Sequence, residues 1–142
     1  MENCGCMASV LKLSNQIRRE MNYMTEYSGI QTYILFFLLE AGETQAVYQK
    51  DLERTFNTCS ASISSTLKKM EKEGLIVRRR VPGDDRLKRV LPTSQAMEMK
   101  RHIDETICLL ERQMTEDIGA EKLEVFTEVS EQMLQNMTEK RR

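Results

Sequence analysis

Residues 48–93 read YQKDLERTFNTCSASISSTLKKMEKEGLIVRRRVPGDDRLKRVLPT and contain the pattern that decides the fold. Leu52 and Phe56 lie four positions apart in residues 49–56, as one side of a short amphipathic helix requires. After the polar turn NTCS, the spacing predicts a second helix with one apolar face. The residues of that face are Ile63, Leu67 and Met70. Two short helices joined by a tight turn indicate a helix-turn-helix.

The opposite face of the second helix consists of small hydroxyl residues followed by lysines. Serine and threonine are indifferent helix formers, so a face that only met water would be better served by glutamate, lysine or alanine. Small side chains permit close approach to a major groove, where hydroxyls and lysines bind phosphates and base edges. We therefore interpret this face as DNA-binding, and a merely solvated face is the alternative. Its residues are Ser60, Ser62, Ser64, Ser65, Thr66, Lys68 and Lys69.

A basic β-hairpin is predicted directly after Gly74, which ends the second helix. Residues 75–81, LIVRRRV, have the β-branched content of a strand. The next four residues, PGDD, are expected to form the turn, and residues 87–92, LKRVLP, can return beside the first strand.

The tip of this hairpin combines acids with arginine. Asp84 and Asp85 are expected to organise the turn by bonding to its backbone amides and to a neighbouring arginine. Arg86 would then be preorganised for DNA, although it could instead serve only as a structural partner of these acids. Arg79 and Lys88 are the other hairpin cations that we assign to DNA.

The charges of the chain are unevenly distributed. The net charge is only −1, which by itself argues against a polyanion as partner. Residues 44–93, however, hold eleven basic and six acidic residues, a net charge of +5. The remainder holds ten basic and sixteen acidic residues, a net charge of −6. A local basic region of this kind is typical of a nucleic-acid-binding surface.

Four further helices are predicted outside the central region. Residues 10–24 carry a single apolar seam, and residues 30–39 are apolar on nearly every side and closed by Gly42. Residues 94–118 are expected to form one long helix, and a last helix starts near Glu121. No local partner is long enough to cover the seams of the terminal helices, so we expect a second copy of the chain to do so.

The order of these elements resembles the MarR family of bacterial winged-helix transcription regulators. The passage Met70–Arg78 is similar to the family's L-E-x-x-G-[LYI]-[IV]-x-R, with methionine in place of the usual first leucine. Asp84, Arg86 and Lys88 match its wing signature D-x-R-x-K. Pro92 and the following SQAMEM depart from the family, which leaves the end of the second strand open but not the wing.

The resemblance implies a mainly α fold with a small β-hairpin wing. Residues 1–142 would form one domain, with residues 30–93 as the winged helix-turn-helix lobe and residues 7–26 and 94–138 as dimerisation helices. It further implies a homodimer that binds palindromic double-stranded DNA, with recognition helices in successive major grooves and each wing arginine at a minor groove. Such a regulator would be a repressor that a small molecule or an oxidant releases.

Two sets of residues are candidates for sensing that signal. Family members often bind small aromatic acids between the DNA lobe and the dimerisation helices, although scattered aromatic residues are more often part of a core. The candidate pocket residues are Tyr23, Tyr27, Tyr33, Phe36 and His102. The candidate redox residues are Cys59, Cys4 and Cys6, of which Cys59 would gain thiolate character from the dipole of the second helix and nearby lysines. Cys108 is expected to be a small core residue.

Other classes of protein fit the sequence less well. The longest apolar run, YILFFLL, is far shorter than the roughly 20 residues that a membrane helix needs. The N-terminus lacks the pattern of a secretory signal, so we expect a cytoplasmic location with free thiols. His102 has no nucleophile or metal-ligand cluster spaced beside it, so neither an enzyme nor a bound cofactor or metal is predicted. A winged-helix module that binds proteins instead of DNA is the remaining alternative.

Overall fold

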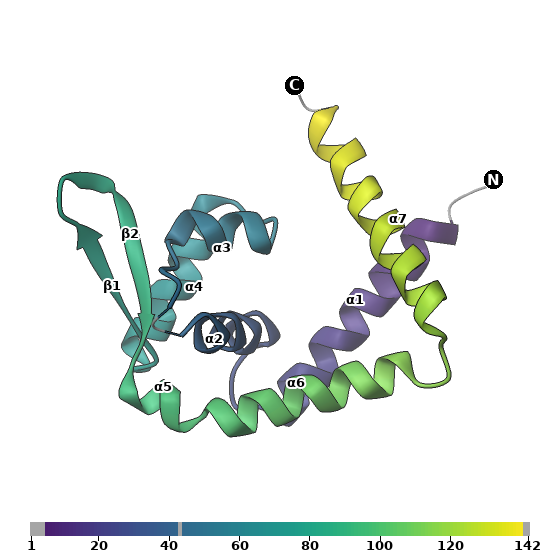
Figure 1. The fold of residues 1–142 in the computed structure, drawn as a ribbon, viewed down its shortest axis with the longest axis horizontal. Coiled ribbons are helices and arrows are strands. Elements are labelled where there is room, and N and C mark those ends of the chain that lie inside the picture. Colours follow the sequence, from purple (N-terminus) through teal and green to yellow (C-terminus); the bar gives the residue numbers. More distant parts are fainter. Residues whose placement is uncertain (1–4, 43, 141–142) are drawn as a thin grey trace. The chain divides into compact units, whose positions relative to one another are not determined.

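The computed structural model describes residues 5–42 and 44–140. These residues form helices and one antiparallel hairpin, as Figure 1 shows. In chain order the elements are α1 (Gly5–Met24), α2 (Gly29–Ala41), α3 (Gln49–Thr55), α4 (Ser60–Lys72), β1 (Ile76–Val81), β2 (Asp84–Pro92), α5 (Ser94–Glu98), α6 (Lys100–Thr115) and α7 (Ala120–Glu139). The chain divides into two compact units, one up to Leu110 and one from Glu111 onwards. The mainly helical fold with a hairpin is confirmed.

The core of the first unit lies among α2, α3, α4, the hairpin and α5. The apolar residues that the spacing assigned to the inner face of α4 are all buried, and Leu52 of α3 is buried with them. α2 supplies Ile34, Leu35 and Leu38 to the same cluster, which is why its sequence is apolar on nearly every side. The core thus fixes one face of α4 and leaves the opposite face exposed.

The C-terminal end of α2 follows the predicted glycine signal, and its N-terminal end is capped by a serine. Ser28 caps its first turn, and the side chain of Gln31 returns a hydrogen bond to the backbone of Ser28, which is the reciprocal arrangement of a capping box. At the other end, Gly42 has a positive φ of 57° and its N–H donates to the carbonyl oxygen of Leu38. Glycine enters this conformation without the steric penalty of a Cβ atom.

The hairpin loop is tighter than the PGDD turn that the sequence suggested. Val81 pairs directly with Asp84, so the loop contains only Pro82 and Gly83, and Gly83 has a φ of 84° that reverses the chain at once. β2 therefore begins at Asp84 and not at residue 87. The next pair is Arg80 with Lys88, so residues 85–87 form a bulge with no partners on β1.

The prediction of one continuous helix over residues 94–118 is wrong, because two helices, α5 and α6, occupy this stretch. α5 ends at Glu98 because the N–H of Met99 bonds to the carbonyl of Ala96, three residues back, which tightens the turn before α6 begins. α6 then ends at Thr115, where Asp117 with a φ of 59° redirects the chain toward α7. Met97, in α5, is 52% exposed.

Thr93 joins the end of the hairpin to both neighbouring helices. Its hydroxyl donates to the carbonyl oxygen of Gly74 at 2.6 Å and accepts from the N–H of Ala96 at 3.2 Å, so one side chain caps α5 and binds the turn between α4 and β1. We expect Thr93→Ala to lower the free energy of unfolding by about 1–2 kcal/mol, since it removes a cap and leaves a carbonyl without its partner.

Urea unfolding measures this effect, and Thr93→Ser is the control because it keeps the hydroxyl. The serine variant should retain most of the wild-type stability. Equal loss in Thr93→Ala and Thr93→Ser would show that the methyl group, and not the hydroxyl, stabilises this junction.

Candidate nucleic-acid interface

The exposed face of α4 carries the residues that the sequence assigned to DNA. Ser60, Ser62, Ser65, Lys68 and Lys69 are all exposed. Ser65 and Lys68 lie opposite the buried apolar residues, whereas Ser60, in the first turn, lies nearer to their side of the helix. The hydroxyl of one further member, Thr66, is turned back onto the helix, where it donates to the carbonyl oxygen of Ser62 at 3.0 Å. Sequence reasoning did not include Ala61 and Lys72, which are exposed on the same face. The helical period, counted from the buried residues, would have included them.

Ser64 lies at the edge of this face and contacts the hairpin instead. Its hydroxyl accepts a hydrogen bond from the Arg78 guanidinium at 3.4 Å. The same nitrogen of Arg78 donates to Oε1 of Gln49 in α3 at 3.3 Å, and Nε of Arg78 binds Glu71 of α4. The Arg78 side chain is only 16% exposed. Arg78 therefore fastens β1 to both helices of the helix-turn-helix.

This role of Arg78 was missed at the level of sequence. Glu71 and Arg78 are the glutamate and arginine of the passage Met70–Arg78 that resembles the MarR pattern. The pattern thus contained the signal, but the spacing of seven residues across a glycine turn did not by itself indicate an ion pair.

The hairpin is positively charged on both of its faces. Arg79 is paired across the strands with Arg89, and Arg80 is paired with Lys88. Neighbouring pairs along a strand point to opposite faces, so each face carries two cations side by side. Like charges directly opposite each other destabilise a hairpin, which makes a bound polyanion a natural way to relieve the repulsion.

The tip of the hairpin holds Arg86 through its backbone. Oδ1 of Asp84 accepts a hydrogen bond from the N–H of Arg86 at 3.0 Å, as expected for a turn-organising aspartate. Asp85 is exposed, and within residues 5–42 and 44–140 its side chain makes no hydrogen bond. In the same residues the Arg86 guanidinium forms no ion pair with either aspartate. The side chain of Arg86 is exposed in the bulge of β2 and is available to a ligand.

A cavity of about 370 Å³ lies beneath the turn between α1 and α2. It is lined by Tyr23, Met24, Thr25, Glu26, Tyr27, Thr32, Met99, His102 and Ile103. Three of the five predicted pocket residues are thus brought together. Burial, followed by the nearby charges of Glu26 and Glu73, raises the pKa of Tyr27.

The other two predicted pocket residues belong to a separate aromatic cluster. The ring of Tyr33 lies 5.7 Å from that of Phe36 and 5.7 Å from that of Phe56, which it meets edge to face. This contact packs α2 against the end of α3, so Tyr33 and Phe36 have a packing role.

The described cysteines differ in their surroundings. Cys59 occupies the N-cap position of α4, and its thiol donates to the hydroxyl of Ser62 at 3.3 Å. Hydrogen bonds from the side chain and backbone of Ser62 lower the pKa of Cys59, whereas the sequence had suggested the dipole and the lysines as the cause. Cys6 and Cys108 are exposed, so the prediction of Cys108 as a core residue is wrong. Cys4 lies outside the described residues.

The lowered pKa of Cys59 predicts selective alkylation. A thiolate forms at lower pH when hydrogen bonds stabilise it, so the alkylation rate of Cys59 should reach half its maximum below the ordinary thiol pKa of 9.0. Peptide mass spectrometry after iodoacetamide treatment at a series of pH values measures the rate for each cysteine. Ser62→Ala should move the profile of Cys59 to higher pH and leave Cys108 unchanged, and a profile indifferent to this change would contradict the assignment.

Comparison with known proteins finds similarity to one family of regulators. A model of the MarR family matches residues 26–87, which run from the turn before α2 to the bulge of β2. An uncharacterized HTH-type transcriptional regulator of Bacillus subtilis (strain 168), YdgJ, is 29% identical over 113 residues, 80% of this chain and 67% of its own length. The central part of the chain, residues 26–87, is thus similar to the MarR family.

Solved MarR-type structures have the same fold. The transcription regulator MarR from Oenococcus oeni PSU-1 superposes with a TM-score of 0.76 at 22% identity, over 92% of this chain and 96% of that one. MepR of S. aureus in complex with DNA superposes with a TM-score of 0.77 at 16% identity, over 92% and 96% of the two chains. The match to the MarR family model includes α4, Arg78 and Arg86, the parts of the interface described above.

Two other kinds of feature are absent from the part of the chain that the structure describes. In residues 5–42 and 44–140, no group of three histidine, cysteine or acidic side chains is placed to hold a metal ion. None of the helices in the described part of the chain combines the length and apolar character that crossing a membrane requires.

Proposed function

We propose that this transcriptional regulator of the MarR family binds double-stranded DNA as a homodimer at palindromic operators. In each copy α4 would lie in a major groove and the hairpin would reach the adjacent minor groove. The observation that carries the proposal is the pair of cation rows on the two faces of the hairpin, beside the exposed serines and lysines of α4. A ribbon inserted between two phosphate backbones meets negative charge on both sides, which suits this arrangement.

The charge of the central region supports a strongly electrostatic interaction. Residues 44–93 carry +5, so two copies present +10 to one duplex. Lys68, Lys72 and Arg86 have no ion-pair partner in the described part of the chain, and they are free to bind phosphates. Each phosphate that is neutralised releases condensed counterions, so affinity should fall steeply as salt rises.

The apolar faces of the terminal helices support dimerisation. α7 has no buried residue along its described length. Its apolar side is uncovered, since Phe126 is 53% exposed and Met137 is 68% exposed on that side. A 20-residue helix with an uncovered apolar side is marginal in water, and the matching helix of a second copy would cover it. α1 likewise exposes Val10 and Leu13. In this proposal residues 7–26 and 94–138 dimerise and residues 30–93 bind DNA.

We further propose that the regulator is a cytoplasmic repressor that acts by binding and not by catalysis. Simultaneous binding by two lobes requires their spacing to match the groove spacing, so a ligand that changes the spacing weakens DNA binding. The cavity lined by Tyr23, Tyr27 and His102 is the proposed site for a small-molecule effector. Cys59, at the start of α4, is the proposed site for an oxidant signal.

Salt titration of duplex binding tests the proposed function. Fluorescence anisotropy with a labelled random-sequence duplex should show the logarithm of the association constant falling linearly with the logarithm of salt concentration, with a slope of about −0.9 for each phosphate contacted. About three contacts per copy, or six for the dimer, would give a loss of about a thousandfold between 50 and 200 mM salt. A protein that did not bind duplex DNA at low ionic strength would instead fit a winged-helix module that binds proteins.

A further inference from the structure

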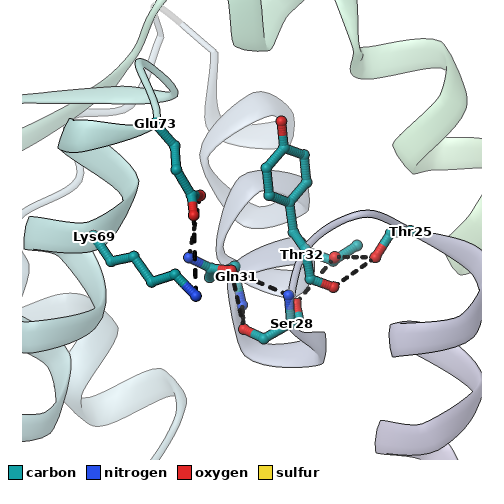
Figure 2. Close-up of polar contacts among 7 residues, drawn as sticks. Thr25, Ser28, Gln31, Thr32, Lys69 and Glu73 are labelled. Carbon is teal, nitrogen blue, oxygen red and sulfur yellow. Dashed lines mark hydrogen bonds and ion pairs between the residues drawn. The ribbon is translucent and has the colours of Figure 1, made fainter.

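Gln31 is a buried amide in the first turn of α2. Only 2% of its surface is exposed, and its Oε1 accepts hydrogen bonds from both the N–H of Ser28 at 3.1 Å and the hydroxyl of Ser28 at 3.2 Å. These bonds fix which end of the amide faces the turn between α1 and α2. The NH₂ group of Gln31 must therefore point the other way, toward α4 (Figure 2).

The group that receives Gln31 is the carboxylate of Glu73, at the end of α4. Nε2 of Gln31 donates to Oε2 of Glu73 at 3.4 Å, and the other carboxylate oxygen lies 4.0 Å from Nζ of Lys69. Figure 2 shows the carboxylate contacting both the amide and the ammonium group. Glu73 is 30% exposed, whereas Lys69 is 65% exposed on the face of α4 that we assign to DNA.

The distances indicate that Glu73 is restrained from pairing fully with Lys69. A Lys–Glu pair spaced by four residues on a helix can close to normal hydrogen-bond distance, as Lys100 and Asp104 do at 2.8 Å on α6. The 4.0 Å separation of Lys69 and Glu73 is longer, and the Glu73 carboxylate also accepts a hydrogen bond from the buried amide. A carboxylate that closed on Lys69 would compete with a DNA phosphate for the same ammonium group.

We propose that Gln31 is a positioning residue for DNA binding, which holds Glu73 back so that Lys69 can bind a phosphate. The proposal rests on the proposed DNA-binding function and adds to it a residue outside the DNA-contacting elements. Gln31 acts through Glu73 and does not itself contact DNA.

The hydrogen bond between Gln31 and Glu73 also links the cavity to α4. Thr25 and Thr32 line the cavity, and their hydroxyls lie 3.0 Å apart. The hydroxyl of Thr32 also donates to the carbonyl oxygen of Ser28, the residue that orients Gln31. An occupant that displaced this turn would disturb Ser28, release Glu73 from Gln31 and lower the charge available at Lys69. The route from cavity to DNA face is thus three residues long: Ser28, Gln31 and Glu73.

A double-mutant cycle tests the inference on the full chain, with a fluorescein-labelled random-sequence duplex at low salt as the probe. Gln31→Leu should weaken binding about three- to tenfold in the dimer, the range expected when an exposed ion pair closes in both copies. It should also reduce the salt slope by about one phosphate contact per copy. In the Lys69→Gln background, Gln31→Leu should have no further effect on affinity.

Two further substitutions separate positioning from folding. Glu73→Gln removes the competing charge while the Ser28 cap stays intact, so it should bind at least as tightly as wild type and should rescue Gln31→Leu. Lys68→Gln is the matched control, because Lys68 is exposed on the same helix without an ion-pair partner in the described residues, and the effect of Gln31→Leu should persist in that background.

Two results would overturn the inference, and they are distinguishable. If Gln31→Leu weakened binding equally in the wild-type, Lys69→Gln and Lys68→Gln backgrounds, Gln31 would have only a structural role. If wild-type protein bound no duplex at all, the proposed function would fail together with the inference.

Discussion

Replacing Arg86 with alanine should weaken duplex binding by about 100-fold without changing the melting temperature of the protein. Each copy would lose one cationic contact of about 1–3 kcal/mol, and a dimer loses two. The folded state should be unaffected, because the Arg86 guanidinium makes no hydrogen bond or ion pair with residues 5–42 and 44–140. Its backbone bond to Asp84 survives the substitution. Anisotropy titrations with a duplex, combined with thermal melting, measure both quantities.

Arg101→Ala is the matched control for Arg86→Ala. Arg101 is an exposed arginine on α6 that pairs with Glu105 at 2.9 Å, outside the proposed interface. Its removal changes the net charge by the same amount and should leave DNA affinity within about twofold of wild type, since distant exposed charges are largely screened. Equal losses of DNA affinity for the two variants would mean that binding depends on the total charge of the protein and not on Arg86 at the hairpin tip.

Replacing Phe126 with lysine should convert the dimer to monomers at micromolar concentration. Phe126 lies on the apolar side of α7, and burial of a phenylalanine side chain contributes about 2–3 kcal/mol. Twofold symmetry doubles the loss, and the new ammonium group must also be kept in water. The dimer dissociation constant should therefore rise by about a thousandfold or more. Analytical ultracentrifugation measures the change.

Glu128→Gln provides the control for this variant, because it also raises the net charge by one unit but lies on the polar side of α7. It should remain dimeric. Phe126→Lys should also lose most of its DNA affinity, because one lobe alone makes half of the contacts. A Phe126→Lys variant that stayed dimeric would place the dimer interface elsewhere than on α7.

The helical part of the interface could be predicted because its signals are local. The buried face of α4 follows from the spacing of Ile63, Leu67 and Met70, and the opposite face follows from the same period. Gly42 and Gly74 both have positive φ, in agreement with their predicted role at helix ends.

The parts that could not be predicted depend on contacts between elements. The contact of Arg78 with Gln49, Ser64 and Glu71 requires the hairpin to lie against α3 and α4, which no periodicity encodes. The bulge at residues 85–87 depends on the register of the two strands. The two-residue loop fixes this register, but the sequence PGDD does not show which of its residues form the loop.

The burial of single residues was also hard to predict. Cys108 and Met97 fall within apolar helical patterns, yet both are exposed in the structure of one copy. The predicted pocket residues were separated in a similar way: Tyr33 packs against Phe36 and Phe56, whereas Tyr23, Tyr27 and His102 line the cavity. The sequence shows which helices carry aromatic residues, but only the packing shows whether each of them lines the cavity or belongs to the aromatic cluster.

Selection of bound fragments from a random-sequence DNA pool tests the central claim most directly, which is that two copies of α4 and the hairpin bind one duplex. We predict enrichment of an inverted repeat whose half-sites are centred about one helical turn apart, near 10–10.5 base pairs, because twofold symmetric lobes bind successive major grooves. Enrichment of a single unrepeated site, or no enrichment at low salt, would contradict the account.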